Sequence, residues 1–249
     1  RAFVPIEAMP RRIIDAFLSA EDKSFYTHSG IDFTGVARAV VKNVQNLASG
    51  RRLVGASTIT QQVAKNFLLT NEVSFDRKIK EAILAVRIER AFTKDRILEL
   101  YLNEIYLGYG SYGVAAAALN YFNKSLIELD ISEAAFLAAL PKAPNNYNPV
   151  TKRAAAKGRR NWVIGRLLED GRITPTEATS ASNQPLMIAD RQDTEFVQAE
   201  YFTEEVRREL VARFGEDQLY EGGLSVRTTL DPRMQAAART TLRRGLEAY

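Results

Sequence analysis

Apolar side chains recur at steps of three and four residues from about residue 10 to residue 183, and this periodicity constrains the fold more than any other feature of the chain. Ile14, Phe17 and Leu18 share one face of the first such segment, which begins at Pro10. Three further helix starts are marked by side chains that can accept hydrogen bonds from free backbone N–H groups, namely Thr93, Asp130 and Thr174. The pattern predicts a mainly helical fold.

The pattern changes in the last quarter of the chain. A helix is predicted around residues 200–214, and the alternation over residues 224–230 is typical of a β-strand. Asp231 then predicts the start of another helix. We therefore predict two parts, a large helical domain over residues 1–188 and a small α/β linker over residues 189–249.

Composition excludes several kinds of site. The 249 residues include no cysteine and one histidine, His28, so neither a disulfide framework nor a zinc site of several histidines can form. The net charge of +4 suits an anionic substrate, an anionic membrane surface or nucleic acid, and does not choose among them. No segment is long and apolar enough to span a bilayer. Because the chain begins at Arg1 rather than Met, we expect an excised fragment.

Glu21 is the first candidate for chemistry, because it ends the apolar face of the first predicted helix. A carboxylate among apolar side chains loses hydration, so its pKa is expected to rise, and a raised pKa suits a general base. A helix-terminal glutamate that is half in solvent is the alternative, and Glu21 alone does not decide between the two. His28 is expected to be structural.

Two further segments indicate phosphate binding. Residues 55–62 form a small-residue turn that leads into a helix start and then Lys65, where N–H groups, hydroxyls and an ammonium can cradle a phosphate. Arg77 and Lys78 precede Glu81 by four and three residues, so both cations can neighbour its carboxylate in a pyrophosphate clamp. The alternatives are an ordinary capped loop and a solvated, salt-bridged helix.

Residues 94–113 and 137–149 complete a set of five segments. Both segments have patterns that indicate a mainly structural role. The first predicts a helix followed by glycines, and the second predicts a core helix followed by a proline-rich loop. In this order and spacing, the five segments resemble the motifs of glycosyltransferase family 51, the peptidoglycan glycosyltransferases, over residues 10–165. The one clear departure is Ala56, where the family usually has glycine.

The resemblance implies a lysozyme-like, two-lobed helical fold with a membrane-associated jaw. It implies that Glu21 deprotonates the acceptor sugar of lipid II, while the donor MurNAc C1 is inverted and undecaprenyl pyrophosphate leaves. Glu81 would be the second essential acid, acting with a divalent cation (Mg²⁺ or Mn²⁺) that it ligates, or by orienting Arg77 and Lys78. The other substrate-binding residues that the motifs imply are Ser57, Gln62 and Lys65, at the donor phosphates, and Asn103.

The same resemblance implies partners and a location. The expected partners are lipid II, the lipid-linked glycan chain, the bacterial inner membrane and a transpeptidase domain, because the tail is similar to the linker of class A penicillin-binding proteins. No nucleic acid is expected. The location would be the periplasmic face of the inner membrane, with an N-terminal transmembrane anchor absent from this fragment.

The pattern of residues 36–54, which include Arg51 and Arg52, predicts either an interfacial helix or an ordinary packed helix. The family's phosphoglycolipid inhibitor, moenomycin, is expected to bind at the donor site.

Two rival functions would also fit parts of this pattern. A lytic transglycosylase or goose-type lysozyme relative would share the fold and one catalytic glutamate, but it has no need for the cations around Glu81. A non-catalytic module that only binds peptidoglycan or a protein partner has no need for either Glu21 or Glu81. The residues therefore favour a glycosyltransferase.

Overall fold

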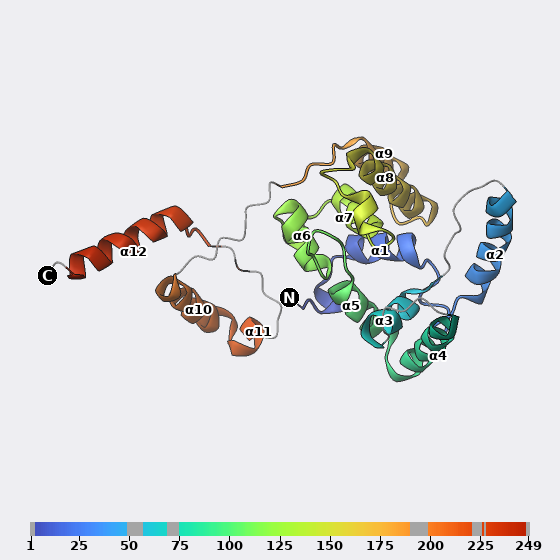
Figure 1. The fold of residues 1–249 in the computed structure, drawn as a ribbon, viewed down its shortest axis with the longest axis horizontal. Helices are drawn as coiled ribbons and strands as arrows, with labels where there is room; N and C mark the ends of the chain where they lie inside the picture. The colour runs from blue at the N-terminus through green and yellow to red at the C-terminus, as the bar shows by residue number, and fades with distance from the viewer. Residues whose placement is uncertain are drawn as a thin grey trace. The chain divides into compact units, whose positions relative to one another are not determined.

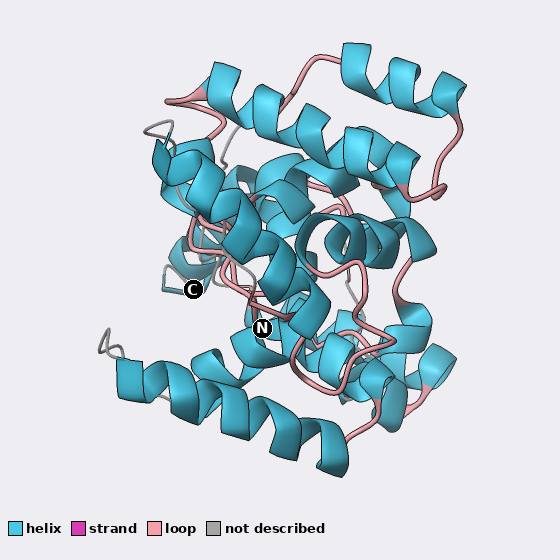
Figure 2. Cartoon of the chain, turned by 90° about the vertical axis from the view of Figure 1, so that its right-hand side faces the viewer, coloured by secondary structure: helices cyan, strands magenta, loops and turns pink. Residues whose placement is uncertain are grey.

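The computed structural model describes residues 3–48, 57–68, 75–189, 199–220, 226 and 228–247. The chain divides into two compact units, Phe3–Ala189 and Asp190–Tyr249, and each is described by itself (Figure 1). The sequence-based boundary lies between residues 188 and 189. All regular elements of the described residues are helices (Figure 2), so the predicted mainly helical class is confirmed.

The regular elements described in the first unit are helices. Its α-helices are α1 (Arg11–Glu21), α2 (Phe33–Ala48), α3 (Ile59–Leu68), α4 (Phe75–Ala91), α5 (Lys94–Glu104), α6 (Val114–Phe122), α7 (Ile131–Ala139), α8 (Arg153–Glu169) and α9 (Pro175–Asn183). Three short 3₁₀ helices lie between them, η1 (Ile6–Ala8), η2 (Leu126–Glu128) and η3 (Pro144–Tyr147).

Helix α7 forms the centre of this unit, because it is buried over most of its length and packs against both α1 and α8. Its alanines leave room for close helix packing, and its one aromatic residue, Phe136, meets Tyr121 of α6 edge to face at 5.4 Å. Phe17 of α1 packs in the same way against Tyr101 of α5. The burial of α1 fixes the position of its last residue, Glu21.

A second cluster of helices is formed by α3, α4 and α5, with α3 packed against the other two. Glu89 of α4 joins all three helices, because its Oε1 accepts hydrogen bonds from Thr60 Oγ1 and Lys94 Nζ, each at 2.6 Å. A buried carboxylate with two donors is satisfied rather than stranded. This network fixes the start of α3 relative to α4.

The predicted helix starts are confirmed. Asp130 and Thr174 form reciprocal capping boxes with Glu133 and Glu177, and Thr93 Oγ1 accepts from the backbone N–H of Arg96. The first helix begins one residue later than its proline, since Pro10 is the N-cap and α1 starts at Arg11.

The second unit contains α10 (Glu200–Phe214), α11 (Glu216–Tyr220) and α12 (Pro232–Glu247). Asp231 caps α12 as predicted, with Oδ1 accepting from the backbone N–H groups of Arg233 and Met234. The predicted strand is not formed at Val226 or at residues 228–230, and its other residues lie outside the described part. A lone strand has no neighbour to complete its hydrogen bonds, so alternation alone cannot hold it. None of the described helices is both long and apolar enough to cross a bilayer.

Candidate active site

A cleft of about 310 Å³ opens at the C-terminal end of α1. Its walls come from α1, the loop that follows it, α2, the start of α3 and α8. The charged and hydroxyl-bearing side chains around it include Glu21, Lys23, Asp32, Arg38, Lys42, Ser57 and Arg166. A concave site with convergent charges is where a substrate is expected to bind.

Glu21 lies in this cleft, half-buried, as the last residue of α1. Its Oε2 accepts a hydrogen bond of 2.8 Å from Gln62 Nε2 of α3. Burial raises the pKa of Glu21 and is the largest influence on it, while the Gln62 hydrogen bond and the charges of Arg159 and Lys142 act in the lowering direction. The net rise keeps the carboxylate a better proton acceptor than a solvated glutamate.

Ser57, Lys78 and Glu81 form a connected group, of which the sequence spacing predicts only the approach of Lys78 to Glu81. Lys78 Nζ donates to Ser57 Oγ at 2.8 Å and also pairs with Glu81 Oε1 one turn further along α4. The Glu81 side chain is only 3% exposed, whereas that of Lys78 is 49% exposed. The buried carboxylate therefore holds the ammonium, which keeps one side open to a ligand. Arg77, on the same helix, is half-buried.

The loop between α1 and α2 joins these two parts of the site. Asp22 Oδ2 accepts from His28 Nε2 and from the backbone N–H of Ile59, each at 2.9 Å, which pins the start of α3 beside Glu21. Thr58 and Gln61 close a capping box at the same helix start, because each backbone N–H donates to the other side chain. His28 is thus structural, as expected.

Gly30 fixes how closely this loop approaches α4. Its φ is +94°, and a Cβ at this position would lie 2.9 Å from the backbone carbonyl of Ala85. The Gly30 carbonyl also accepts from Thr58 Oγ1 at 2.7 Å. A side chain would force apart the loop that carries Asp22 and the helix that carries Glu81.

The sequence profile of the transglycosylase family matches residues 1–168, which is more than half of the chain. The chain belongs to the transglycosylase family. This confirms the family predicted from the five motifs and, with it, the enzyme class, a peptidoglycan glycosyltransferase. The regular elements of the described residues are all helices, in agreement with the helical fold that the resemblance implies.

The relatives of this transglycosylase are longer proteins. Penicillin-binding protein 1A of Rickettsia bellii (strain RML369-C) is 53% identical over 250 residues, which cover 100% of this chain and 32% of that protein. Penicillin-binding protein 1A of Aquifex aeolicus (strain VF5) is 46% identical, over 99% of this chain and 33% of that protein. A crystal structure of penicillin-binding protein 1A from Haemophilus influenzae is 33% identical and covers 96% of this chain and 25% of that chain, with a TM-score of 0.46. The chain thus spans about a third of the length of the curated relatives it matches.

Two cations that face Glu21 in the transglycosylase were not singled out from the sequence. Arg159 of α8 and Lys142, in the loop after α7, both lower the pKa of Glu21 against the effect of burial. Lys142 belongs to the fifth motif, whose pattern indicates a structural role, and Arg159 lies outside the five motifs. Their approach to Glu21 spans more than a hundred residues, so no local pattern could reveal it.

Gln62 and Lys65 were both predicted at the donor phosphates. Gln62 instead donates to Glu21, so in this structure it orients the proposed base. Lys65 is exposed on α3, nearly one turn after Gln62. Gly55 and Ala56 of the second motif lie outside the described residues.

Helix α2 presents different faces to the cleft and to solvent. Arg38 and Lys42 line the cleft, whereas Phe33, Val40 and Val41 are 75%, 57% and 62% exposed. These three apolar residues therefore do not pack into the core of the unit, which is not expected of an ordinary packed helix. Arg51, Arg52 and Val54 of the predicted interfacial segment lie outside the described residues.

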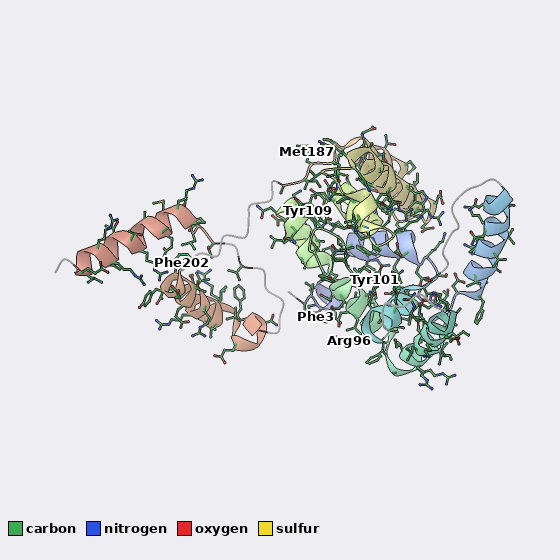
Figure 3. The ribbon with its side chains drawn as sticks, viewed as in Figure 1. Phe3, Arg96, Tyr101, Tyr109, Met187 and Phe202 are labelled. Carbon is green, nitrogen blue, oxygen red and sulfur yellow. The ribbon has the colours of Figure 1, made fainter. Side chains whose placement is uncertain are left out.

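Asn103 is not among the residues that line the cleft, and its contact with substrate stays a prediction. Its side chain is buried on α5, and Oδ1 accepts from the backbone N–H of Val4 while Nδ2 donates to the carbonyls of Val4 and Glu99. The neighbouring chain end is held in the same way, since Glu99 Oε2 accepts from the N–H of Ile6. Phe3 lies under the guanidinium of Arg96 (Figure 3). Asn103 therefore attaches the N-terminal segment to the transglycosylase core.

Asn103→Ala should destabilise the fold without changing the chemistry. We expect the free energy of unfolding to fall by about 2 kcal/mol, because a buried backbone N–H and carbonyls lose their partners. The rate per folded molecule should stay near that of the parent. Thermal unfolding and initial rates measured well below the midpoint check both points, with the exposed Asn183→Ala as the control. A tenfold or larger fall in rate at unchanged stability would place Asn103 at the substrate site.

Glu81 was also predicted to ligate a divalent cation. Within the described residues, no group of three or more His, Asp or Glu side chains is arranged to hold a metal ion. The Glu81 carboxylate is paired with Lys78, which supplies a positive charge at the same place. Mg²⁺ needs only one or two carboxylates when substrate phosphates complete its shell, so Glu81 fits such an ion in the presence of a pyrophosphate.

Proposed function

We propose that this transglycosylase polymerises lipid II into β-1,4-linked glycan strands. The proposal rests on one observation: Glu21 and Ser57 line the same cleft. The pKa of Glu21 is raised, and Ser57 is hydrogen-bonded to Lys78, which pairs with Glu81. Transfer of a sugar from a pyrophosphate to a hydroxyl requires a general base for the hydroxyl and a cation for the leaving group. The chain supplies both.

In the proposed reaction, Glu21 accepts the proton of the acceptor GlcNAc 4-hydroxyl as that oxygen attacks C1 of the donor MurNAc. The new C1–O4 bond forms on the face opposite the leaving group. The bond from C1 to the phosphate oxygen breaks, its electron pair leaves with undecaprenyl pyrophosphate, and the anomeric centre is inverted. Gln62 holds the base in position, and Lys78 neutralises the charge that grows on the pyrophosphate.

We also infer where the domain acts. The relatives are named penicillin-binding proteins and are about three times as long, which supports a transpeptidase domain in the full-length chain. We place the domain on the periplasmic face of the bacterial inner membrane, held by an N-terminal transmembrane helix, with lipid II and the lipid-linked glycan chain as its partners and no nucleic acid partner.

Labelled lipid II tests the proposed function directly. Incubation with the chain in detergent, followed by gel separation, should give a ladder of glycan strands and release undecaprenyl pyrophosphate. Cleavage of preformed glycan strands in place of polymerisation would favour a lytic enzyme. Binding of lipid II without any product, under conditions where an authentic peptidoglycan glycosyltransferase is active, would favour a non-catalytic module.

A divalent cation remains part of the proposal, with Glu81 and the donor pyrophosphate as its ligands. Such an ion would add charge stabilisation at the leaving group. We expect EDTA to lower the polymerisation rate about tenfold and Mg²⁺ or Mn²⁺ to restore it. Independently of activity, Mg²⁺ should raise the unfolding temperature only when inorganic pyrophosphate is also present, and Glu81→Gln should remove that response. An unchanged rate in EDTA would contradict the metal site, and Lys78 alone would then stabilise the charge on the leaving pyrophosphate.

The exposed apolar face of α2 is expected to dock on membranes. Val40→Asp with Val41→Asp should reduce binding to anionic liposomes about tenfold or more, because two side chains that would enter the interface become charged. Co-sedimentation at low salt measures this. Ile127→Asp is the matched control, because Ile127 is an apolar side chain that is 73% exposed on η2. Equal liposome binding by the double variant and the parent would rule out this docking face.

A further inference from the structure

Trp162 is the only tryptophan of the chain, and it lies on α8 at the edge of the cleft that contains Glu21. Its side chain is unusually open for so large a ring, since 44% of the residue remains exposed. Trp162 takes no part in the proposed proton transfer or in binding the leaving group. An exposed indole inside a concave, otherwise charged site can offer a flat apolar surface to a substrate.

Arg159 holds this ring in place. It precedes Trp162 by three residues on α8, and its guanidinium carbon lies 3.7 Å from the centroid of the indole ring. Stacking of this kind covers one face of the ring and restricts its rotation. The ring is therefore preorganised, so a ligand that contacts its remaining surface does not have to order a mobile side chain.

The position of α8 decides which part of the substrate Trp162 can meet. Helix α8 packs against α1 and α7, whereas Ser57 and Lys78 belong to the segment before α3 and to α4. Figure 1 draws α8 on one side of α1 and the α3–α4 pair on the other. Glu21 ends α1, accepts a hydrogen bond from Gln62 of α3, and is influenced by the charge of Arg159 on α8. Trp162 thus belongs to the helix on the other side of α1 from α3 and α4, and α4 carries the proposed leaving-group cation.

We propose that Trp162 stacks against a pyranose ring of the acceptor and so positions the acceptor hydroxyl at Glu21; this inference rests on the proposed function. In a β-linked GlcNAc or MurNAc ring the bulky substituents are equatorial, and the axial C–H bonds make each face weakly positive and apolar. Such a face complements the electron-rich face of an indole. A pyrophosphate or a lipid chain offers no comparable flat surface.

Kinetics of Trp162 variants test the proposal. Trp162→Leu keeps an apolar side chain but removes the ring, and it should raise KM for lipid II about tenfold while kcat changes by less than about threefold. Trp162→Phe should restore most of the affinity, because it retains an aromatic face. Equal KM values for the leucine variant and the parent, in a chain that polymerises lipid II, would overturn the assignment.

A purely structural role through Arg159 predicts a different result. Loss of the ring would then free the guanidinium, change its effect on the pKa of Glu21, and move the acid limb of the pH profile of kcat/KM. Acceptor stacking predicts an acid limb at the same pH as in the parent and a change only in KM. A shifted limb with an unchanged KM would therefore count against stacking.

The single tryptophan also supplies a direct optical readout. Because its fluorescence reports only this ring, titration with the soluble disaccharide GlcNAc-β-1,4-MurNAc, which lacks pyrophosphate and lipid, should give a saturable change in emission. A Glu21→Gln chain should show the same change, because binding does not require turnover. Emission that responds to anionic vesicles but not to the disaccharide would mark Trp162 as a membrane contact and sink the proposal. Failure of the proposed function would appear separately, as absence of glycan product from the parent chain.

Discussion

Glu21→Gln is expected to lower the rate of lipid II polymerisation about 10³-fold or more while the chain stays folded. The amide cannot accept the acceptor proton, yet its carbonyl oxygen can still accept the hydrogen bond from Gln62 Nε2 that the carboxylate accepts now. Initial rates on labelled lipid II measure the loss, and circular dichroism checks the fold. Glu7→Gln, an exposed carboxylate on η1, is the control and should retain full activity. A folded Glu21→Gln chain that polymerises at the parent rate would refute the assignment of the base.

The raised pKa of Glu21 adds a stability signature to the same variant. Folding holds the proton of Glu21 more tightly than the unfolded chain does, so the parent loses stability as pH rises from the ordinary glutamate value of 4.5 through the folded pKa. Glutamine does not titrate. The variant should therefore match the parent in unfolding temperature below pH 4.5 and exceed it at neutral pH. In the parent, the acid limb of kcat/KM should lie above pH 4.5 for the same reason.

The sequence predicts the helices well because their signals are local. Capping at Thr93, Asp130 and Thr174 depends on side chains within three residues, and each prediction holds in the structure. The strand over residues 224–230 was inferred from the same kind of local pattern. Strand formation, however, requires a partner, and alternation within one segment cannot say whether a partner exists.

The candidate site also contains contacts within one helix, which the sequence can predict, and contacts between distant segments, which it cannot. Lys78 and Glu81 are one turn apart on α4, so spacing alone brings them together, and the structure pairs them. Trp162 reaches the cleft, and Arg159 influences Glu21, only because α8 packs against α1, and the sequence contains no signal of that packing. Asn103 shows a second limit of sequence-based prediction. It lies within a motif, yet its side chain forms its hydrogen bonds with the backbone of Val4, which is distant in sequence.

Lys78→Ala is expected to lower the polymerisation rate by about 10²-fold to 10³-fold, because a cation aimed at developing charge stabilises the transition state by several kcal/mol. It should also reduce affinity for moenomycin, whose phosphate would meet the same ammonium. Lys80→Ala is the matched control, since Lys80 is an exposed lysine two residues away on the same helix. Rates on labelled lipid II and competition binding with labelled moenomycin measure the two effects. Equal loss in both variants would point to overall charge rather than to a specific contact.

The role of Lys78 in catalysis can be separated from its role in stability. Removing the ammonium leaves Glu81 as a buried carboxylate without its cation, and we expect a loss of about 1 kcal/mol, limited because Lys78 is half exposed. Adding Glu81→Gln removes the stranded charge, so the double variant should recover stability. It should not recover activity, because neither change replaces the cation at the leaving group. Recovery of both stability and polymerisation in the double variant would show that Lys78 serves only to neutralise Glu81, and the donor clamp would then have to be assigned to other cations.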